Sequence, residues 1–255
     1  TEGLQAEFGD TRVLDTPLAE SGIIGTAIGL AMRGYRPVCE IQFDGFIFPG
    51  FDQITSQLAK TTARHEGSLT MPVVIRVPYG GHIGAIEHHQ ESPEAYFAHT
   101  PGLRSLSPST PHDAYWLIQE AIASNDPVLF FEPKSRYWAK GDVDTSASGI
   151  PTHSSKVARQ GTEVTLIGHG AVVSMLLDAA ALAAEEGIIL APVELERLAR
   201  TKSQGNESAA PRRLSLSLPI RPPVTGKGRN PAVGPSEPKR HQIGVQLLQG
   251  PALLA

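Results

Sequence analysis

Residues 72–78 read Pro-Val-Val-Ile-Arg-Val-Pro, a short run of mostly β-branched residues with proline at both ends. A short apolar run of this kind is typical of a buried strand in a parallel sheet. The glycine-rich stretch Tyr-Gly-Gly-His-Ile-Gly follows directly at 79–84, and residues 51–65 before it have helical periodicity. A helix, a strand and a glycine-rich loop in this order indicate one unit of an α/β fold.

The same alternation continues in both directions along the chain. We predict further helices at 18–32, 92–98, 111–123 and 171–186, and strands at 37–43, 103–106, 128–131, 164–168 and 188–190. Strands that alternate with helices over this length predict a parallel sheet with helices on both faces. We divide the chain into a first α/β domain (1–140), a linker (141–160), the start of a second α/β domain (161–190) and a C-terminal segment (191–255).

Composition separates this last segment from the rest of the chain. Residues 191–255 contain no aromatic residue, nine of the 21 prolines, and ten Lys or Arg against four Glu. Such a segment cannot easily bury enough apolar area to offset the entropy of ordering, so we expect it to be disordered or an aberrant C-terminus. The chain as a whole has a net charge of -4 and one cysteine. These values argue against a nucleic-acid-binding protein and exclude an internal disulfide.

Three polar clusters fall at the ends of predicted elements. The first contains Glu20, in the first turn of the helix predicted at 18–32; a structural acid stabilised by the helix dipole explains it as well as a catalytic carboxylate does. The second is Glu-Ile-Gln-Phe-Asp-Gly-Phe-Ile-Phe-Pro at 40–49, in which Gln42 and Asp44 lie among aromatic residues. A plain hydrophobic core is the alternative interpretation of that stretch.

The third cluster is Glu-His-His-Gln-Glu at 87–91, after the glycine-rich loop. Imidazole and carboxylate are metal ligands, but adjacent histidines point in different directions and no His-Glu-x-x-His spacing occurs. A histidine in a loop after a parallel strand is a better candidate for a general acid or base, because sites in open α/β sheets lie at the carboxyl ends of strands. We therefore predict no metal ligand in this chain. The sequence also has no Walker loop, Rossmann fingerprint or Gly-x-Ser-x-Gly motif.

Together these clusters resemble the beta subunits of thiamine-diphosphate-dependent 2-oxo acid dehydrogenases, over roughly residues 5–189. The resemblance is carried by Gln-Phe-Asp-Gly-Phe-Ile-Phe-Pro-Gly-Phe-Asp-Gln (42–53), Glu-His-His-Gln-Glu-Ser-Pro-Glu-Ala (87–95) and Phe-Phe-Glu-Pro-Lys-Ser-Arg-Tyr-Trp (130–138). It implies a transketolase-like pyrimidine-binding domain. These motifs are closer to the branched-chain type, which implies decarboxylation of branched-chain 2-oxo acids with acyl transfer to lipoamide. A pyruvate or acetoin dehydrogenase beta subunit, or a non-catalytic remnant that only pairs with an alpha subunit, is the alternative.

The resemblance also implies roles for individual residues. Glu20 matches the glutamate that hydrogen-bonds the pyrimidine ring of the cofactor. Phe46 matches the aromatic residue that stacks on that ring, and Leu18 and Gln42 match residues that line the same pocket. His89 matches the histidine on the substrate side, which is implied to assist acyl transfer to a lipoyl arm.

The family pattern further implies partners. The diphosphate and its Mg²⁺ are expected on an alpha subunit in an alpha2-beta2 assembly, because Gly-Asp-Val at 141–143 does not match the Gly-Asp-Gly metal motif. A lipoyl-bearing acyltransferase is the expected acyl acceptor, and a structural monovalent cation is compatible with the family. We expect residues before Thr1 and a complete second domain in an intact subunit. Its expected location is the cytoplasm in a bacterium or the mitochondrial matrix in a eukaryote.

Overall fold

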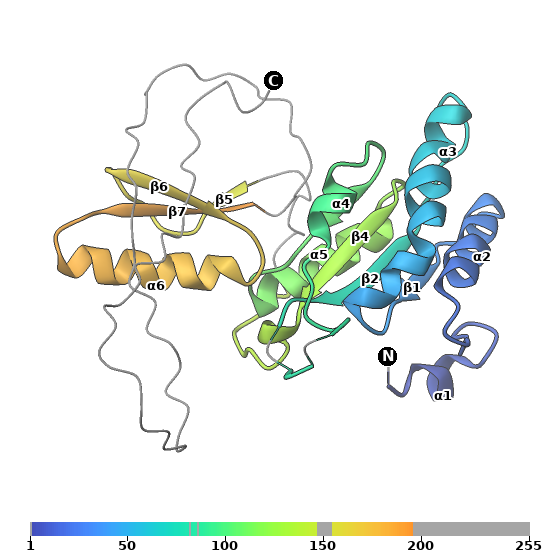
Figure 1. Ribbon diagram of the computed structural model, residues 1–255, viewed down its shortest axis with the longest axis horizontal. Helices are drawn as coiled ribbons and strands as arrows, with labels where there is room; N and C mark the ends of the chain where they lie inside the picture. Colours follow the sequence, from blue (N-terminus) through green and yellow to red (C-terminus); the bar gives the residue numbers. More distant parts are fainter. Residues whose placement is uncertain (1, 82, 86, 147–154, 196–255) are drawn as a thin grey trace, which may run out of the picture. The chain divides into compact units, whose positions relative to one another are not determined.

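The computed structural model describes residues 2–81, 83–85, 87–146 and 155–195 (Figure 1). A parallel sheet with strand order β1-β2-β4-β3 organises the first part of the chain. Its strands are β1 (Val38–Glu40), β2 (Val74–Tyr79), β3 (Arg104–Leu106) and β4 (Val128–Pro133). The helical elements are α1 (Leu4–Phe8), α2 (Glu20–Met32), the 3-10 segment η1 (Asp44–Gly50), the π-helical η2 (Gln53–Leu58), α3 (Ala59–Arg64), α4 (Glu94–Ala98), α5 (Pro111–Ala123) and the 3-10 turn η3 (Lys134–Arg136).

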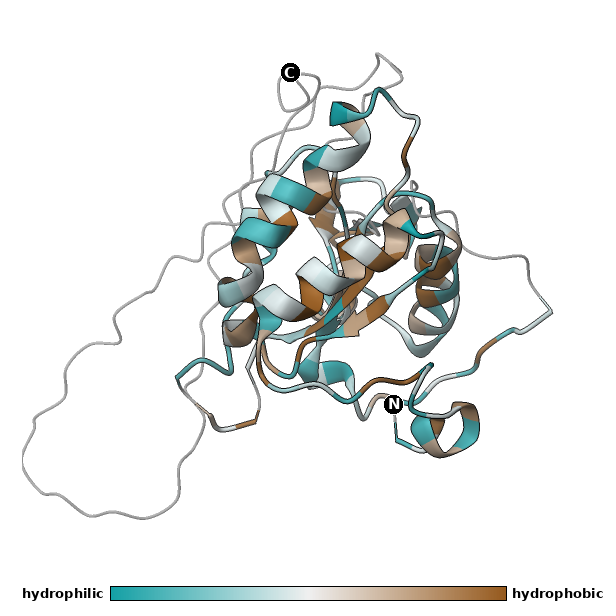
Figure 2. Cartoon of the chain, turned by 90° about the vertical axis from the view of Figure 1, so that its right-hand side faces the viewer, coloured by the Kyte–Doolittle hydropathy of each residue, from teal (hydrophilic) through white to brown (hydrophobic). Residues whose placement is uncertain are grey.

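The strands are apolar on both sides because each face of the sheet is covered by helices. On one face, Ile75 and Phe131 belong to a core cluster with residues of α2, α3 and α4. On the other face, Val74 and Phe130 pack with Leu117 of α5. In Figure 2 the brown, hydrophobic colour concentrates on the strands between the helices, whereas outer helix turns are teal. The predicted α/β fold, a parallel sheet with helices on both faces, is confirmed.

Helix α5 has the predicted bounds because capping interactions fix its ends. Thr110 and Asp113 form a capping box, in which the Asp113 N–H donates to the Thr110 hydroxyl at 3.1 Å and the Thr110 N–H donates to the Asp113 carboxylate at 3.1 Å. At the other end, the guanidinium of Arg36 donates to the carbonyl oxygens of Ile122, Ala123 and Ser124 at 3.0, 3.2 and 2.8 Å. A cation at the carboxyl end of a helix is favoured by the helix dipole.

The chain departs from the predicted pattern after β1. The strand predicted at 37–43 is only three residues long, because the chain turns into η1 at Asp44. The helix predicted at 51–65 is present as η2 and α3, with a π-helical first part. The short β1 matters for the site, because it places residues 41–50 in a connection at the carboxyl end of the sheet rather than in a strand.

A second α/β unit follows the segment that links it to the first. It contains β5 (Ser155–Val157), β6 (Val164–Gly168), α6 (Val172–Glu185) and β7 (Leu190–Leu195). β6 pairs with β7 in parallel and β5 pairs with β7 in an antiparallel manner.

The strand predicted at 188–190 is displaced: β7 begins at its last residue, Leu190, and continues to Leu195, into the segment that we expected to start at 191. Residues 147–154 of the predicted linker and residues 196–255 of that segment lie outside the described residues. Within the described part of the chain, no helix is long and apolar enough to cross a membrane.

Candidate functional site

Three connections meet at the carboxyl ends of β1, β2 and β4. The Lys134 Nζ, directly after β4, forms an ion pair with the Asp44 Oδ1, after β1, at 2.7 Å. The two side chains are 3% and 0% exposed. The other oxygen of Asp44 accepts a hydrogen bond from the backbone N–H of Glu91, in the connection that follows β2. A buried ion pair and one backbone hydrogen bond thus join all three connections.

An aromatic cluster lies beside this ion pair. The imidazole of His89 stacks on Phe43, with ring centroids 3.8 Å apart and an interplanar angle of 24°. Phe46 contacts the same imidazole edge-on, at 5.4 Å and 86°. The Nδ1 atom of His89 is buried and has no hydrogen-bond partner among the described residues. The structure therefore brings two predicted site residues, Phe46 and His89, together with Phe43, which sequence reasoning did not single out.

Glu20 is the first residue of α2, and its side chain is buried at 6% exposure. In the part of the chain that the structure describes, no group donates a hydrogen bond to its carboxylate. The end of η1 is packed against this helix start, since a Cβ atom on Gly50 would lie 3.3 Å from the carbonyl oxygen of Glu20. Its oxygens are not among the fully buried polar atoms that lack a partner, so the carboxylate can still accept a hydrogen bond from a ligand.

The two remaining predicted residues are more exposed. Leu18 is 67% exposed in the turn that precedes α2. Gln42 is exposed after β1 and lines a hollow of about 410 Å³. Their assignment to the cofactor pocket stays a prediction.

The hollow beside Gln42 has a charged wall. Arg76 of β2 forms ion pairs with Glu132 of β4 at 2.6 Å and with Glu40 of β1 at 3.1 Å. The hydroxyl of Tyr137 donates to Glu132 at 2.9 Å. Burial and the negative charge of Glu132 raise the pKa of the Tyr137 hydroxyl, so this phenol stays protonated. Arg76 is therefore paired with two carboxylates across three strands and is not a free cation.

Another buried acid lies near the ion pair. Glu94 begins α4 and is 8% exposed. Burial raises the pKa of its carboxyl; a hydrogen bond from its own backbone lowers the pKa in part, and the negative charge of Asp44 raises it by a lesser amount. Among the described residues, no group of three or more His, Cys, Asp or Glu is arranged to hold a metal ion.

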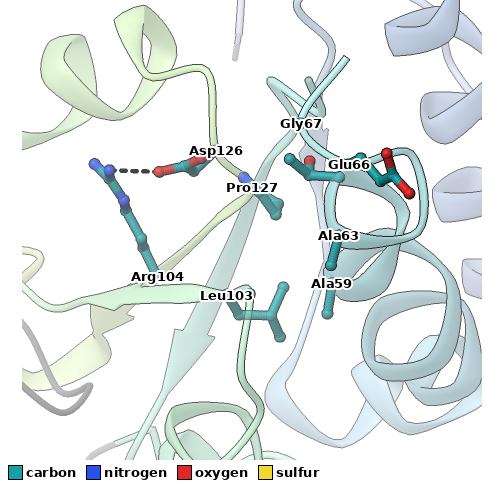
Figure 3. Close-up of a pocket in the computed structure, with 10 residues that line it drawn as sticks. Ala59, Ala63, Glu66, Gly67, Leu103, Arg104, Asp126 and Pro127 are labelled. Carbon is teal, nitrogen blue, oxygen red and sulfur yellow. Dashed lines mark ion pairs between the residues drawn. The ribbon is translucent and has the colours of Figure 1, made fainter. Parts of the chain in front are cut away.

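A second hollow of about 410 Å³ lies at the opposite end of the sheet (Figure 3). It is lined by residues before and at the amino ends of β3 and β4, among them Leu103, Arg104, Asp126 and Pro127. Arg104 and Asp126 form an ion pair across its rim. None of the predicted site residues lines it, so the carboxyl end of the sheet remains the candidate site.

Comparisons with known proteins identify the family of this chain. Residues 1–139 match the family described as transketolase, pyrimidine binding domain. The "Pyruvate dehydrogenase E1 component subunit beta" of Leifsonia xyli subsp. xyli is 68% identical over 199 residues, which are 78% of this chain and 59% of that protein. The "3-methyl-2-oxobutanoate dehydrogenase subunit beta" of Mycobacterium tuberculosis is 53% identical over 186 residues, covering 73% of this chain and 53% of that protein.

The chain thus spans between half and two thirds of the length of these relatives. A solved structure titled "Split gene transketolase, inactive beta4 tetramer" shares the fold, with a TM-score of 0.62 and 20% sequence identity. The match covers 77% of this chain and 63% of that one.

Proposed function

The chain belongs to the transketolase pyrimidine-binding family, and from this membership we propose that it acts as the beta subunit of a 2-oxo acid dehydrogenase. The observation that carries the proposal is Glu20, a largely buried acidic residue at the start of α2 whose carboxylate accepts no hydrogen bond from the described residues. The aromatic cluster around His89, at the carboxyl end of the same sheet, supports it. The names of the relatives add the reaction class.

Glu20 fits thiamine diphosphate, because its carboxylate can accept a hydrogen bond that no described residue supplies. When bound, this cofactor supplies a thiazolium carbon that adds to the 2-oxo group and stabilises the negative charge left by loss of CO₂. In our proposal Glu20 holds a proton against a ring nitrogen of the pyrimidine. Phe46 packs on the ring, and Leu18 and Gln42 line the pocket.

His89 serves the substrate side in this proposal. Its ring is held by Phe43 and Phe46, and its buried Nδ1 lacks a partner in the described chain. An imidazole can gain or lose a proton near neutral pH. We assign it the proton transfer that accompanies movement of the acyl group to a lipoyl sulfur.

The expected partners follow from the part of the cofactor site that this chain provides in our proposal, which is the part that binds the pyrimidine ring. An alpha subunit would hold the diphosphate and its Mg²⁺ in an alpha2-beta2 assembly, and a lipoyl-bearing acyltransferase would receive the acyl group. A structural monovalent cation is compatible with the proposal. The assembly would act in the bacterial cytoplasm or the mitochondrial matrix, according to the source.

The identity of the 2-oxo acid substrate is the more specific part of the proposal. The motifs favour branched-chain 2-oxo acids, and a relative of that name is 53% identical. The relative at 68% identity carries the name pyruvate dehydrogenase, so pyruvate is the competing substrate.

The test is to mix the purified chain with a cognate alpha subunit and to compare kcat/KM for 3-methyl-2-oxobutanoate, pyruvate and acetoin. Turnover of any of the three compounds supports the subunit assignment, and the preferred compound identifies the substrate class. A stable complex without turnover would support the non-catalytic alternative instead.

A further inference from the structure

We propose that the buried ion pair of Asp44 and Lys134 holds His89 in position. This inference rests on the proposed function, because it concerns the histidine assigned to acyl transfer. The two charged groups come from connections after β1 and β4, 90 residues apart in sequence, and their 2.7 Å contact is almost fully shielded from solvent. Neither residue is needed to bind the cofactor in the proposal, so their burial calls for another role.

The connection that carries His89 is hydrogen-bonded to Asp44 and Gly45 on the two sides of the histidine. After it, the backbone N–H of Glu91 donates to the Asp44 carboxylate. Before it, the carbonyl oxygen of His88 accepts a hydrogen bond from the N–H of Gly45 at 3.0 Å. The stacking partner Phe43 directly precedes Asp44 in the chain. Residues 43–45 therefore contact the ring of His89, the carbonyl oxygen of His88 and the amide of Glu91.

Steric contacts leave this connection little freedom. A Cβ atom on Gly45 would lie 2.6 Å from the carbonyl oxygen of His88, so only glycine allows this approach. His88 itself has a φ of 63°, the left-handed conformation that residues other than glycine rarely adopt. Such a conformation persists only where the surrounding structure enforces it. The attachment to Asp44 supplies that enforcement and directs the next residue, His89, onto Phe43.

Lys134 fixes the orientation of the Asp44 carboxylate. A buried ion pair adds little net stability compared with apolar residues of similar volume, but each charge-assisted hydrogen bond is about twice as strong as a neutral one. The Nζ of Lys134 binds one carboxylate oxygen and leaves the other aimed at Glu91. Without the lysine charge, the Asp44 carboxylate loses its fixed orientation, and the hold on the histidine connection weakens.

A spectroscopic experiment on the full chain tests this inference independently of catalysis. The stacked Phe43 ring should shift the His89 Hε1 resonance upfield in a spectrum of ¹³C-labelled histidine, and His89→Gln assigns that signal. In the double variant Asp44→Asn, Lys134→Met, which removes both charges at similar volume, we expect the signal to move most of the way to the position of a free imidazole. Asp126→Asn, which breaks the ion pair at the opposite end of the sheet, is the matched control and should leave it in place.

A kinetic experiment on the assembly with an alpha subunit gives the second readout. We expect acyl transfer to lipoamide to fall about 10- to 100-fold in the double variant, as for a modest misplacement of a reacting group, while decarboxylation measured with an artificial electron acceptor stays within about threefold. A folded double variant with an unchanged His89 signal and normal acyl transfer would overturn the inference. Absence of activity in the wild-type assembly would refute the proposed function but would leave the spectroscopic test of the ion pair intact.

Discussion

Replacing Glu20 with glutamine distinguishes between a cofactor-binding role and a purely structural role of this carboxylate. The amide keeps the shape of the side chain and can still accept a hydrogen bond, but it cannot exchange a proton near neutral pH. Glu20 is the first residue of a 13-residue helix and is 6% exposed. Its charge is therefore attracted by the helix dipole.

Loss of the dipole attraction costs about 0.3–1 kcal/mol. We therefore expect the free energy of unfolding to fall by no more than about 1 kcal/mol. For a chain of this size that is a shift in Tm of about 2–4 °C at most. Thermal unfolding of the purified chain measures it.

Turnover should respond very differently. General acid-base contributions are about 10²- to 10⁴-fold, and we expect kcat for 2-oxo acid decarboxylation in an alpha-beta assembly to fall within that range. Glu20→Asp should recover little, because the shorter side chain withdraws the carboxylate. Asp113→Asn is the matched control, since Asp113 is a buried first-turn acid of another 13-residue helix. It should lower Tm through its capping box and leave turnover normal. Normal turnover for Glu20→Gln would refute the assignment of Glu20 to the cofactor.

Three further predictions concern stability and its pH dependence. Arg36→Ala removes the guanidinium from the carboxyl end of α5 and should lower the free energy of unfolding in urea by about 1 kcal/mol, with partial recovery in Arg36→Lys. Gly102→Ala should cost about 2–4 kcal/mol in the same assay, because its methyl group would lie 2.0 Å from the first carbonyl oxygen of α3 at a φ of 96°. Gly67→Ala, at a φ of 80° with open space around it, should cost only the backbone strain. Burial raises the pKa of Glu94 above its usual value of 4.5, so folding favours the protonated form, and the free energy of unfolding declines as the pH rises through the raised pKa. Glu94→Gln should therefore reduce the difference in Tm between about pH 5 and pH 8. An unchanged difference would contradict this prediction.

Local sequence patterns carried most of the fold prediction. The bounds of α5 and β6 were predicted correctly because a proline, a capping box or a run of β-branched residues marks them in the sequence. The length of β1 was not predicted: the strand ends at Glu40, and the apolar residues that follow lie in a connection whose Asp44 pairs with a lysine from a distant connection. No local pattern reports such a partner. The extension of β7 was missed for a similar reason, since its pairing with β6 outweighs an unfavourable composition.

The candidate site was predictable in its residue types but not in its contacts. Phe46 and His89 were found through motifs, and the structure brings them together. Phe43 was missed, although its position beside Gln42 and Asp44 in the same aromatic stretch was a usable signal. The partnership of Asp44 with Lys134 could not be predicted, because it depends on the adjacency of β2 and β4 in the sheet.

The most direct test of the central claim is calorimetric titration of thiamine diphosphate in the presence of Mg²⁺. It should be carried out on this chain, on the alpha subunit and on their mixture. Our account predicts that this chain alone binds weakly or not at all, that the mixture binds with a Kd in the micromolar range, and that Glu20→Gln weakens binding in the mixture only modestly. Micromolar binding by this chain alone, or no gain in affinity when the two subunits are combined, would contradict the claim that it completes a shared cofactor site.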